Sequence, residues 1–189
     1  QSDEITLVLY TDNKKSALYA DGKKQKILSK LTAKLVNFFN EKRKDFLPEH
    51  DKLAIFDCRI YQTPTLNDAV AQLIWRENDA TKNSISMLAQ SLFSHNSLQN
   101  LDGNKMQDKM MKEKSVNWND LPVKFKRGSY VKLCKVSTKF TADELKDLPE
   151  KHQAHNNPDL TIERNVINVI ELPILNKLSN KVEVIFNNE

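Results

Sequence analysis

The chain has only two cysteines among its 189 residues, and this scarcity removes several classes of protein. Neither Cys58 nor Cys134 has a second cysteine or a histidine at the spacing of a zinc-ligand pair, so we expect no structural zinc site. Both lie within strand-like runs, which favours buried free thiols in a reducing compartment.

The sequence also lacks a long apolar run. No stretch approaches the roughly 20 residues that span a bilayer, and no secretory signal is visible, so we expect no membrane partner. The chain begins without Met in what reads as the middle of a hairpin, so we expect further residues upstream in the native protein. The cytoplasm is the expected compartment, with the mitochondrion as the alternative, because a targeting peptide would lie in that upstream segment.

Charge of one sign is not dominant either. The net charge is +4, from 29 basic and 25 acidic residues, which is too small to indicate nucleic-acid binding by itself. The distribution says more, because lysines gather in two segments, 14–34 and 105–127. Two solvated faces explain this gathering as well as a phosphate-binding role does.

Hydrophobic periodicity predicts a mixture of helices and strands. Helices are expected over about 23–45, from Thr65 to about Phe93, and over about 104–114. Strands are expected at 4–10, 53–61 and 160–172, with a strand pair over 124–136 that Gly128 interrupts. The elements do not alternate strictly, which favours an α+β fold with an antiparallel sheet packed on helices. We expect one domain over 1–189, with a polar insertion near 137–160 that holds at most a turn of helix at 141–147.

Two places in the sequence carry polar groups that suggest chemistry. Asp3 and Glu4 open the first predicted strand, and neighbouring carboxylates supply the hard oxygen ligands that Mg²⁺ prefers. A solvated turn explains the same pair. The long helix has a polar stripe opposite its apolar face, formed by Gln72, Arg76, Asp79 and Asn83. Periodicity alone favours the solvated face of an amphipathic helix.

Six short segments, in this order, have a familiar pattern. They are Gln-Ser-Asp-Glu-Ile at 1–5, Phe-Asp-Cys-Arg at 56–59, Trp-Arg-Glu-Asn-Asp-Ala-Thr-Lys-Asn-Ser at 75–84, Phe-Ser-His at 93–95, Asn-Trp-Asn-Asp-Leu-Pro at 117–122 and Lys-Arg-Gly at 126–128. The series resembles the tRNA-His guanylyltransferase superfamily, template-directed polymerases that add nucleotides to tRNA 5′ ends in the 3′-to-5′ direction. The resemblance is close over about 1–135 and looser beyond.

This resemblance implies a palm like those of polymerases and nucleotide cyclases, two Mg²⁺ ions, GTP or ATP as substrates, tRNA as partner and a homotetrameric assembly. It implies that Asp3 is a catalytic metal ligand supported by Glu4. The chemistry suits this role, since two ions can clamp the attacking and leaving oxygens of phosphoryl transfer. Nucleotide-binding residues would be Ser2, Lys23 and Lys26. The residues implied in tRNA binding are Arg76, Asp79, Asn83, Ser84, His95, Asn119, Lys126 and Arg127.

Two departures from the family pattern qualify these expectations. The first catalytic segment of the family, a Gly-Asp-Gly turn, is absent, so we expect this chain alone to be inactive and assign the activity to the full-length protein. The long helix reads Thr81-Lys82-Asn83-Ser84 where enzymes dedicated to histidine tRNA carry His-Ile-Asn-Asn. This favours the branch that repairs 5′-truncated tRNAs. The alternatives are a dedicated tRNA-His enzyme, a non-catalytic RNA-binding palm and a nucleotide cyclase on a similar palm.

Overall fold

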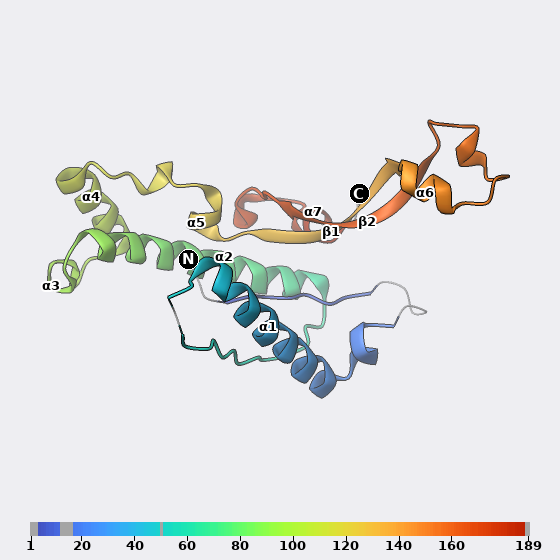
Figure 1. The fold of residues 1–189 in the computed structure, drawn as a ribbon. Helices are drawn as coiled ribbons and strands as arrows, with labels where there is room; N and C mark the ends of the chain where they lie inside the picture. Colours follow the sequence, from blue (N-terminus) through green and yellow to red (C-terminus); the bar gives the residue numbers. More distant parts are fainter. Residues whose placement is uncertain (1–3, 12–16, 50, 188–189) are drawn as a thin grey trace. The chain divides into compact units, whose positions relative to one another are not determined.

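The computed structural model describes residues 4–11, 17–49 and 51–187, which fall into two compact units (Figure 1). The smaller unit comprises residues 5–65, and the larger one joins Glu4 to residues 66–187. The architecture is α+β with an antiparallel sheet, as the sequence predicts. In the described residues, no helix is long and apolar enough to cross a membrane.

The smaller unit is built on helix α1 (Lys24–Phe46), which follows the 3-10 turn η1 (Tyr19–Gly22). Asn40 on α1 exchanges two hydrogen bonds with the backbone of Ala54: its Nδ2 donates to the carbonyl (3.0 Å) and its Oδ1 accepts from the amide (2.8 Å). Phe39 and Phe56 meet edge to face, with ring centroids 5.3 Å apart. These contacts fasten the segment after residue 52 to the helix.

The predicted strands at 4–10 and 53–61 are wrong for the described residues, because neither segment joins a β-ladder there. Most of their apolar residues are exposed, as Ile55 is to 90%, and Phe56, Cys58 and Ile60 are half-buried. A strand needs partners for its backbone N–H and C=O groups, and at Ala54 the Asn40 side chain supplies them instead. The apolar runs therefore mark side-chain chemistry suited to a sheet without providing the neighbouring strand.

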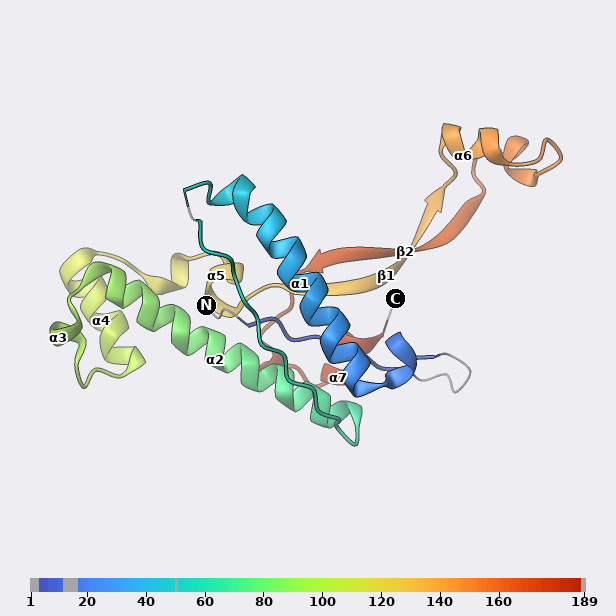
Figure 2. The same cartoon turned by 60° about the horizontal axis from the view of Figure 1, so that its bottom comes forward.

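The larger unit is organised around the 27-residue helix α2 (Leu66–Leu92). Helices α3 (His95–Leu98) and α4 (Gly103–Lys114) pack against its C-terminal part (Figure 2). The buried cluster there consists of Ile85, Ala89, Leu98 and Met110. Nearer the N-terminal end, α2 packs on α7 (Lys181–Phe186), and the buried cluster consists of Ala69, Val70 and Phe186.

Strands β1 (Tyr130–Lys139) and β2 (Thr161–Ile170) form an antiparallel pair, in register from Tyr130 opposite Ile170 to Lys139 opposite Thr161. The β2 prediction is thereby confirmed. Lys132 of β1 donates to the Val184 carbonyl of α7 (3.3 Å), which ties the sheet to that helix. The connection between the strands holds α6 (Ala142–Asp147), as foreseen, and the 3-10 turn η3 (Gln153–His155).

The predicted strand pair over 124–136 is wrong in its first half. Residues Val123–Arg127 form helix α5, which follows the 3-10 turn η2 (Trp118–Asp120). Gly128 ends this helix at φ +89°, ψ −175°, a conformation that side-chain-bearing residues rarely adopt. The true partner of β1 is β2, which begins 22 residues after β1 ends. Cys58 and Cys134 are free, as predicted, but half-buried rather than buried.

Candidate nucleotide and nucleic-acid sites

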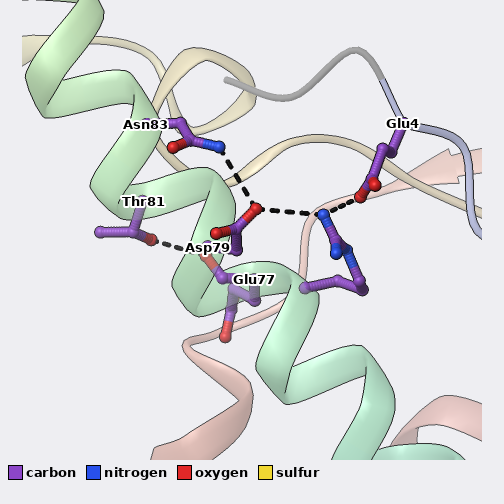
Figure 3. Close-up of polar contacts among 6 residues, drawn as sticks. Glu4, Glu77, Asp79, Thr81 and Asn83 are labelled. Carbon is purple, nitrogen blue, oxygen red and sulfur yellow. Dashed lines mark hydrogen bonds and ion pairs between the residues drawn. The ribbon is translucent and has the colours of Figure 1, made fainter.

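One face of α2 carries a chain of polar contacts among three residues that the sequence singles out. Asp79 Oδ2 accepts from Arg76 Nη2 (3.1 Å) and from Asn83 Nδ2 (3.2 Å). Arg76 also forms an ion pair with the Glu4 carboxylate (Figure 3). Residues three and four apart on a helix lie on one face, so the spacing explains the contact. We call Arg76, Asp79 and Asn83 the surface set.

Trp75 lies next to the surface set and is 59% exposed. The guanidinium of Arg76 lies 4.4 Å from the centroid of its ring, a cation–π contact. Exposed aromatic rings beside cationic groups are the surfaces on which nucleic-acid bases stack. The structure therefore brings an exposed aromatic ring, a cation and two amide or carboxylate groups to one side of α2.

Ser84 has a different environment, although it directly follows Asn83. It is 5% exposed, and its Oγ lies 2.8 Å from the Thr81 carbonyl and 3.1 Å from the Lys126 carbonyl. The indole Nε1 of Trp118 donates to the same oxygen (3.0 Å). Ser84 thus joins α2 to α5 and to the 3-10 turn η2.

Glu77 is a second buried polar residue of α2, one that was not predicted from the sequence. It lies two turns before Ser84 on the same side of the helix. Its side chain is 1% exposed; Oε2 accepts from the Leu175 amide (3.0 Å), in the 3-10 turn η4 (Leu175–Lys177), and Oε1 lies 3.9 Å from Arg127 Nε. Burial and the Glu77 carboxylate together raise the pKa of Tyr130 well above its usual range. A signal was present, because Glu77 falls between Ile74 and Thr81 on the apolar stripe. We call Glu77 and Ser84 the buried pair.

The segment from Trp118 to Arg127 presents the remaining cations. Lys126 Nζ donates to the Asn119 carbonyl (2.6 Å) and lies 5.6 Å from the centroid of the Trp118 ring. Asn119 is exposed, and its amide N–H is capped by Asn117 Oδ1 (3.0 Å). Arg127 is held from inside, since it faces Glu77 and donates to the Leu172 carbonyl (3.4 Å). Asn119 and Lys126 are thus brought together.

His95 is exposed and begins α3, beyond the end of α2. It lies on a different element from the surface set and from the segment 118–127. It remains a separate candidate.

In the smaller unit, Lys23 and Lys26 lie at the N-terminus of α1, and both are exposed. Lys23 is the N-cap residue and makes no capping side-chain bond. Cations at this end oppose the helix dipole, whereas an anion there gains from the dipole and from the unpaired N–H groups. The preceding turn is left-handed at Ala20 (φ 53°), Asp21 (φ 58°) and Gly22 (φ 68°). Strained turns of this kind cluster at functional sites.

The described residues do not include a set of metal ligands. Among residues 4–11, 17–49 and 51–187, no group of three or more histidine, cysteine, aspartate or glutamate side chains is placed to hold a metal ion. Glu4 pairs with Arg76, while Ser2 and Asp3 lie outside the described residues. The described side chains therefore do not fit a Mg²⁺ ion by themselves.

Comparison with known proteins adds two solved structures. A bacterial tRNA(His) guanylyltransferase (Thg1)-like protein in complex with ATP is 43% identical, with a TM-score of 0.59, over 62% of this chain and 51% of that one. A second structure, of such a bacterial protein in complex with GTP, is 30% identical, with a TM-score of 0.56, over 88% of this chain and 57% of that one. The chain thus spans little more than half of their length. No family model and no curated protein matches it.

Proposed function

This chain belongs to the tRNA-His guanylyltransferase superfamily, and on that premise we propose that it is part of a nucleotidyltransferase that adds nucleotides to tRNA 5′ ends in the 3′-to-5′ direction. The observation that carries the proposal is the 43% identity to a protein solved with ATP. Because this chain covers about half of those structures, activity, substrates and partners are all assigned to the full-length protein.

Nucleotide binding is assigned to the N-terminus of α1. There Lys23 and Lys26, together with the amides of the first helical turn, offer positive charge to a triphosphate. Ser2 would contribute from the segment before Ile5. Replacing both lysines by alanine should weaken ATP and GTP binding, while replacing the exposed Lys30 two turns into the same helix should not. Unchanged nucleotide affinity in the double variant would refute this assignment.

Binding of tRNA is assigned to the surface set, to His95 and to the pair of Asn119 and Lys126, with Arg127 beside them. Contacts of this kind go to phosphates and sugars, so they would position the RNA without reading its sequence. The Thr81-Lys82-Asn83-Ser84 stretch supports repair of truncated tRNAs over dedicated guanosine addition to tRNA-His. A homotetramer is part of the same proposal.

Metal dependence is proposed through Asp3, supported by Glu4, with two Mg²⁺ ions supplying charge stabilisation to phosphoryl transfer. Asp3→Ala in the full-length protein should abolish nucleotide addition and leave the unfolding midpoint unchanged. A variant with retained activity would rule out Asp3 as a ligand.

A non-catalytic RNA-binding palm is the second candidate. One observation favours it: the Glu4 carboxylate is engaged by Arg76. Both the surface set and Lys126 would serve this role equally well.

The deciding experiment uses full-length protein, Mg²⁺, labelled GTP and a tRNA that lacks its first 5′ nucleotide, with intact tRNA-His for comparison. Templated addition to the truncated tRNA supports the repair polymerase. Addition to tRNA-His alone supports the dedicated enzyme. Binding of tRNA without addition to either substrate supports the non-catalytic module.

A further inference from the structure

Ser84 is the point where three elements of the larger unit meet through one atom. Its hydroxyl oxygen accepts from the Trp118 indole of η2 and lies within hydrogen-bonding distance of the Lys126 carbonyl of α5. A serine hydroxyl has one proton and two lone pairs. It can therefore accept from Trp118 and donate to a carbonyl at the same time, which alanine cannot do.

Both partners of Ser84 need such a group. Lys126 is the next-to-last residue of α5, and the last carbonyls of a helix have no intrahelical partner. The indole N–H of a partly buried tryptophan has the same need of an acceptor. Loss of the hydroxyl would leave one partly buried donor and one partly buried acceptor without this partner, so the neighbouring segment would shift toward water.

Trp118 and Lys126 are also joined to each other. The Lys126 ammonium lies over the Trp118 ring and donates to the Asn119 carbonyl. An ammonium carries three N–H donors, so this single bond does not exhaust it. The position of the Lys126 charge is thus fixed at both ends of the residue, at its carbonyl by Ser84 and at its ammonium by Asn119.

We propose that Ser84 is a positioning residue that places Trp118 and Lys126 so that the segment 118–127 can grip the phosphate backbone of the tRNA. Ser84 itself does not contact the RNA, because it is buried. This inference rests on the proposed tRNA-binding function and assigns one of the predicted contact residues to an indirect role.

The competing role for Ser84 is a purely intrahelical one, through the Thr81 carbonyl. Helix α2 offers a matched control, since Ser91 makes the same bond to the Leu88 carbonyl (2.7 Å) from an exposed position. If the intrahelical bond is what matters, Ser84→Ala and Ser91→Ala should behave alike. If the bonds to other elements matter, they should differ.

The test measures tRNA affinity of full-length Ser84→Ala, Trp118→Phe, the double variant and Ser91→Ala. Trp118→Phe keeps a ring and removes the N–H, so it guards against a Ser84→Ala variant that fails to fold. We expect each single change to weaken tRNA binding about tenfold. The double variant should also lose about tenfold, because both changes remove the same hydrogen bond between Trp118 and Ser84. The slope of log affinity against log salt concentration should become shallower by about 1, the value for one lost phosphate contact. Nucleotide affinity should stay unchanged.

Hydrogen exchange without tRNA separates this inference from the proposed function. Amides of 118–127 should exchange faster in Ser84→Ala and Trp118→Phe than in the wild type, and at the wild-type rate in Ser91→Ala. Equal exchange in all four proteins, or an unchanged salt dependence, would overturn the positioning role. Wild-type protein that binds no tRNA would refute the proposed function instead.

Discussion

The surface set and the buried pair of α2 occupy the same two turns of one helix and serve different ends. Arg76, Asp79 and Asn83 bond to one another and to Glu4, at positions that water reaches. Glu77 and Ser84, seven residues apart on the face turned to α5 and η4, bond to groups on other elements. The set that a ligand can reach thus bonds within α2 and to Glu4, whereas the buried pair joins α2 to η2, α5 and η4.

The energetics of the two sets differ for the same reason. Solvent-accessible ion pairs contribute about 0–1 kcal/mol, because water competes for both partners. Removing one partner of a buried ion pair, such as Glu77 facing Arg127, leaves the other charge without a partner and costs about 3–5 kcal/mol. Substitution of Glu77 should thus reduce stability most, and substitutions in the surface set should reduce binding with little loss of stability.

The largest effect on stability should come from Glu77→Ala. This change leaves the Leu175 amide without its acceptor and the half-buried Arg127 without its carboxylate. We expect the free energy of unfolding to fall by about 3 kcal/mol, measured by urea denaturation.

Two variants calibrate this result. Glu77→Gln keeps an oxygen for the Leu175 amide but loses the charge facing Arg127, so it should fall between wild type and Glu77→Ala. Asn78→Ala, at the exposed next position, should change stability by less than about 0.5 kcal/mol. If Glu77→Ala were as mild as Asn78→Ala, the distinction between the two sets would fail.

The next effect should be seen in binding. Arg76→Ala combined with Asn83→Ala removes two members of the surface set, and Glu4 and Asp79 can then turn to water. We expect a stability loss below about 1 kcal/mol, together with a larger loss in tRNA affinity than in triphosphate affinity. Gln72→Ala, exposed on the same stripe, is the control. Equal losses of both affinities would indicate general destabilisation.

The helices were largely predictable because periodicity over many residues is a strong signal. Helices α1, α2 and α4 begin and end within two residues of their predicted limits. Segments 4–10 and 53–61 were not predictable in the same way, since a short apolar run suits a strand but says nothing of its neighbour. Helix α5 was missed because five residues are too few to establish a period, and Gly128 was interpreted as a break within a strand.

Much the same limit applied to the site. The spacing of Arg76, Asp79 and Asn83 was enough to foresee that they share a face. Ser84 follows Asn83 by one residue, which is about 100° around a helix, and this rotation carries it from the surface into the interface with α5. The motif made the two residues alike, and only the packing of Trp118 and Lys126 separates them. Glu77 lies in the same segment, 75–84, and was missed because the family resemblance implies roles there only for Arg76, Asp79, Asn83 and Ser84.

The smallest effect on stability should come from an ion pair at the end of the β-hairpin. Its two side chains are more exposed than the buried pair and partly shielded from water. Arg164 of β2 binds Glu144 of α6 through two contacts, Nη1 to Oε1 (2.5 Å) and Nη2 to Oε2 (2.8 Å), and Thr141 completes a capping box. The side-chain bond from Arg164, aided by the Thr141 amide, lowers the pKa of Glu144 to about 2. Because the folded-state pKa lies below the ordinary value of 4.5, the pair stabilises the hairpin end above pH 4.5 and loses this contribution as pH falls toward 2. The difference in melting temperature between wild type and Glu144→Gln should therefore shrink over that range, while Glu163→Gln, at an exposed position of β2, should show no such trend. A difference that stays constant with pH would mean that the charge of Glu144 contributes little. The half-exposed ion pair would then be as weak as the solvent-accessible contacts of the surface set.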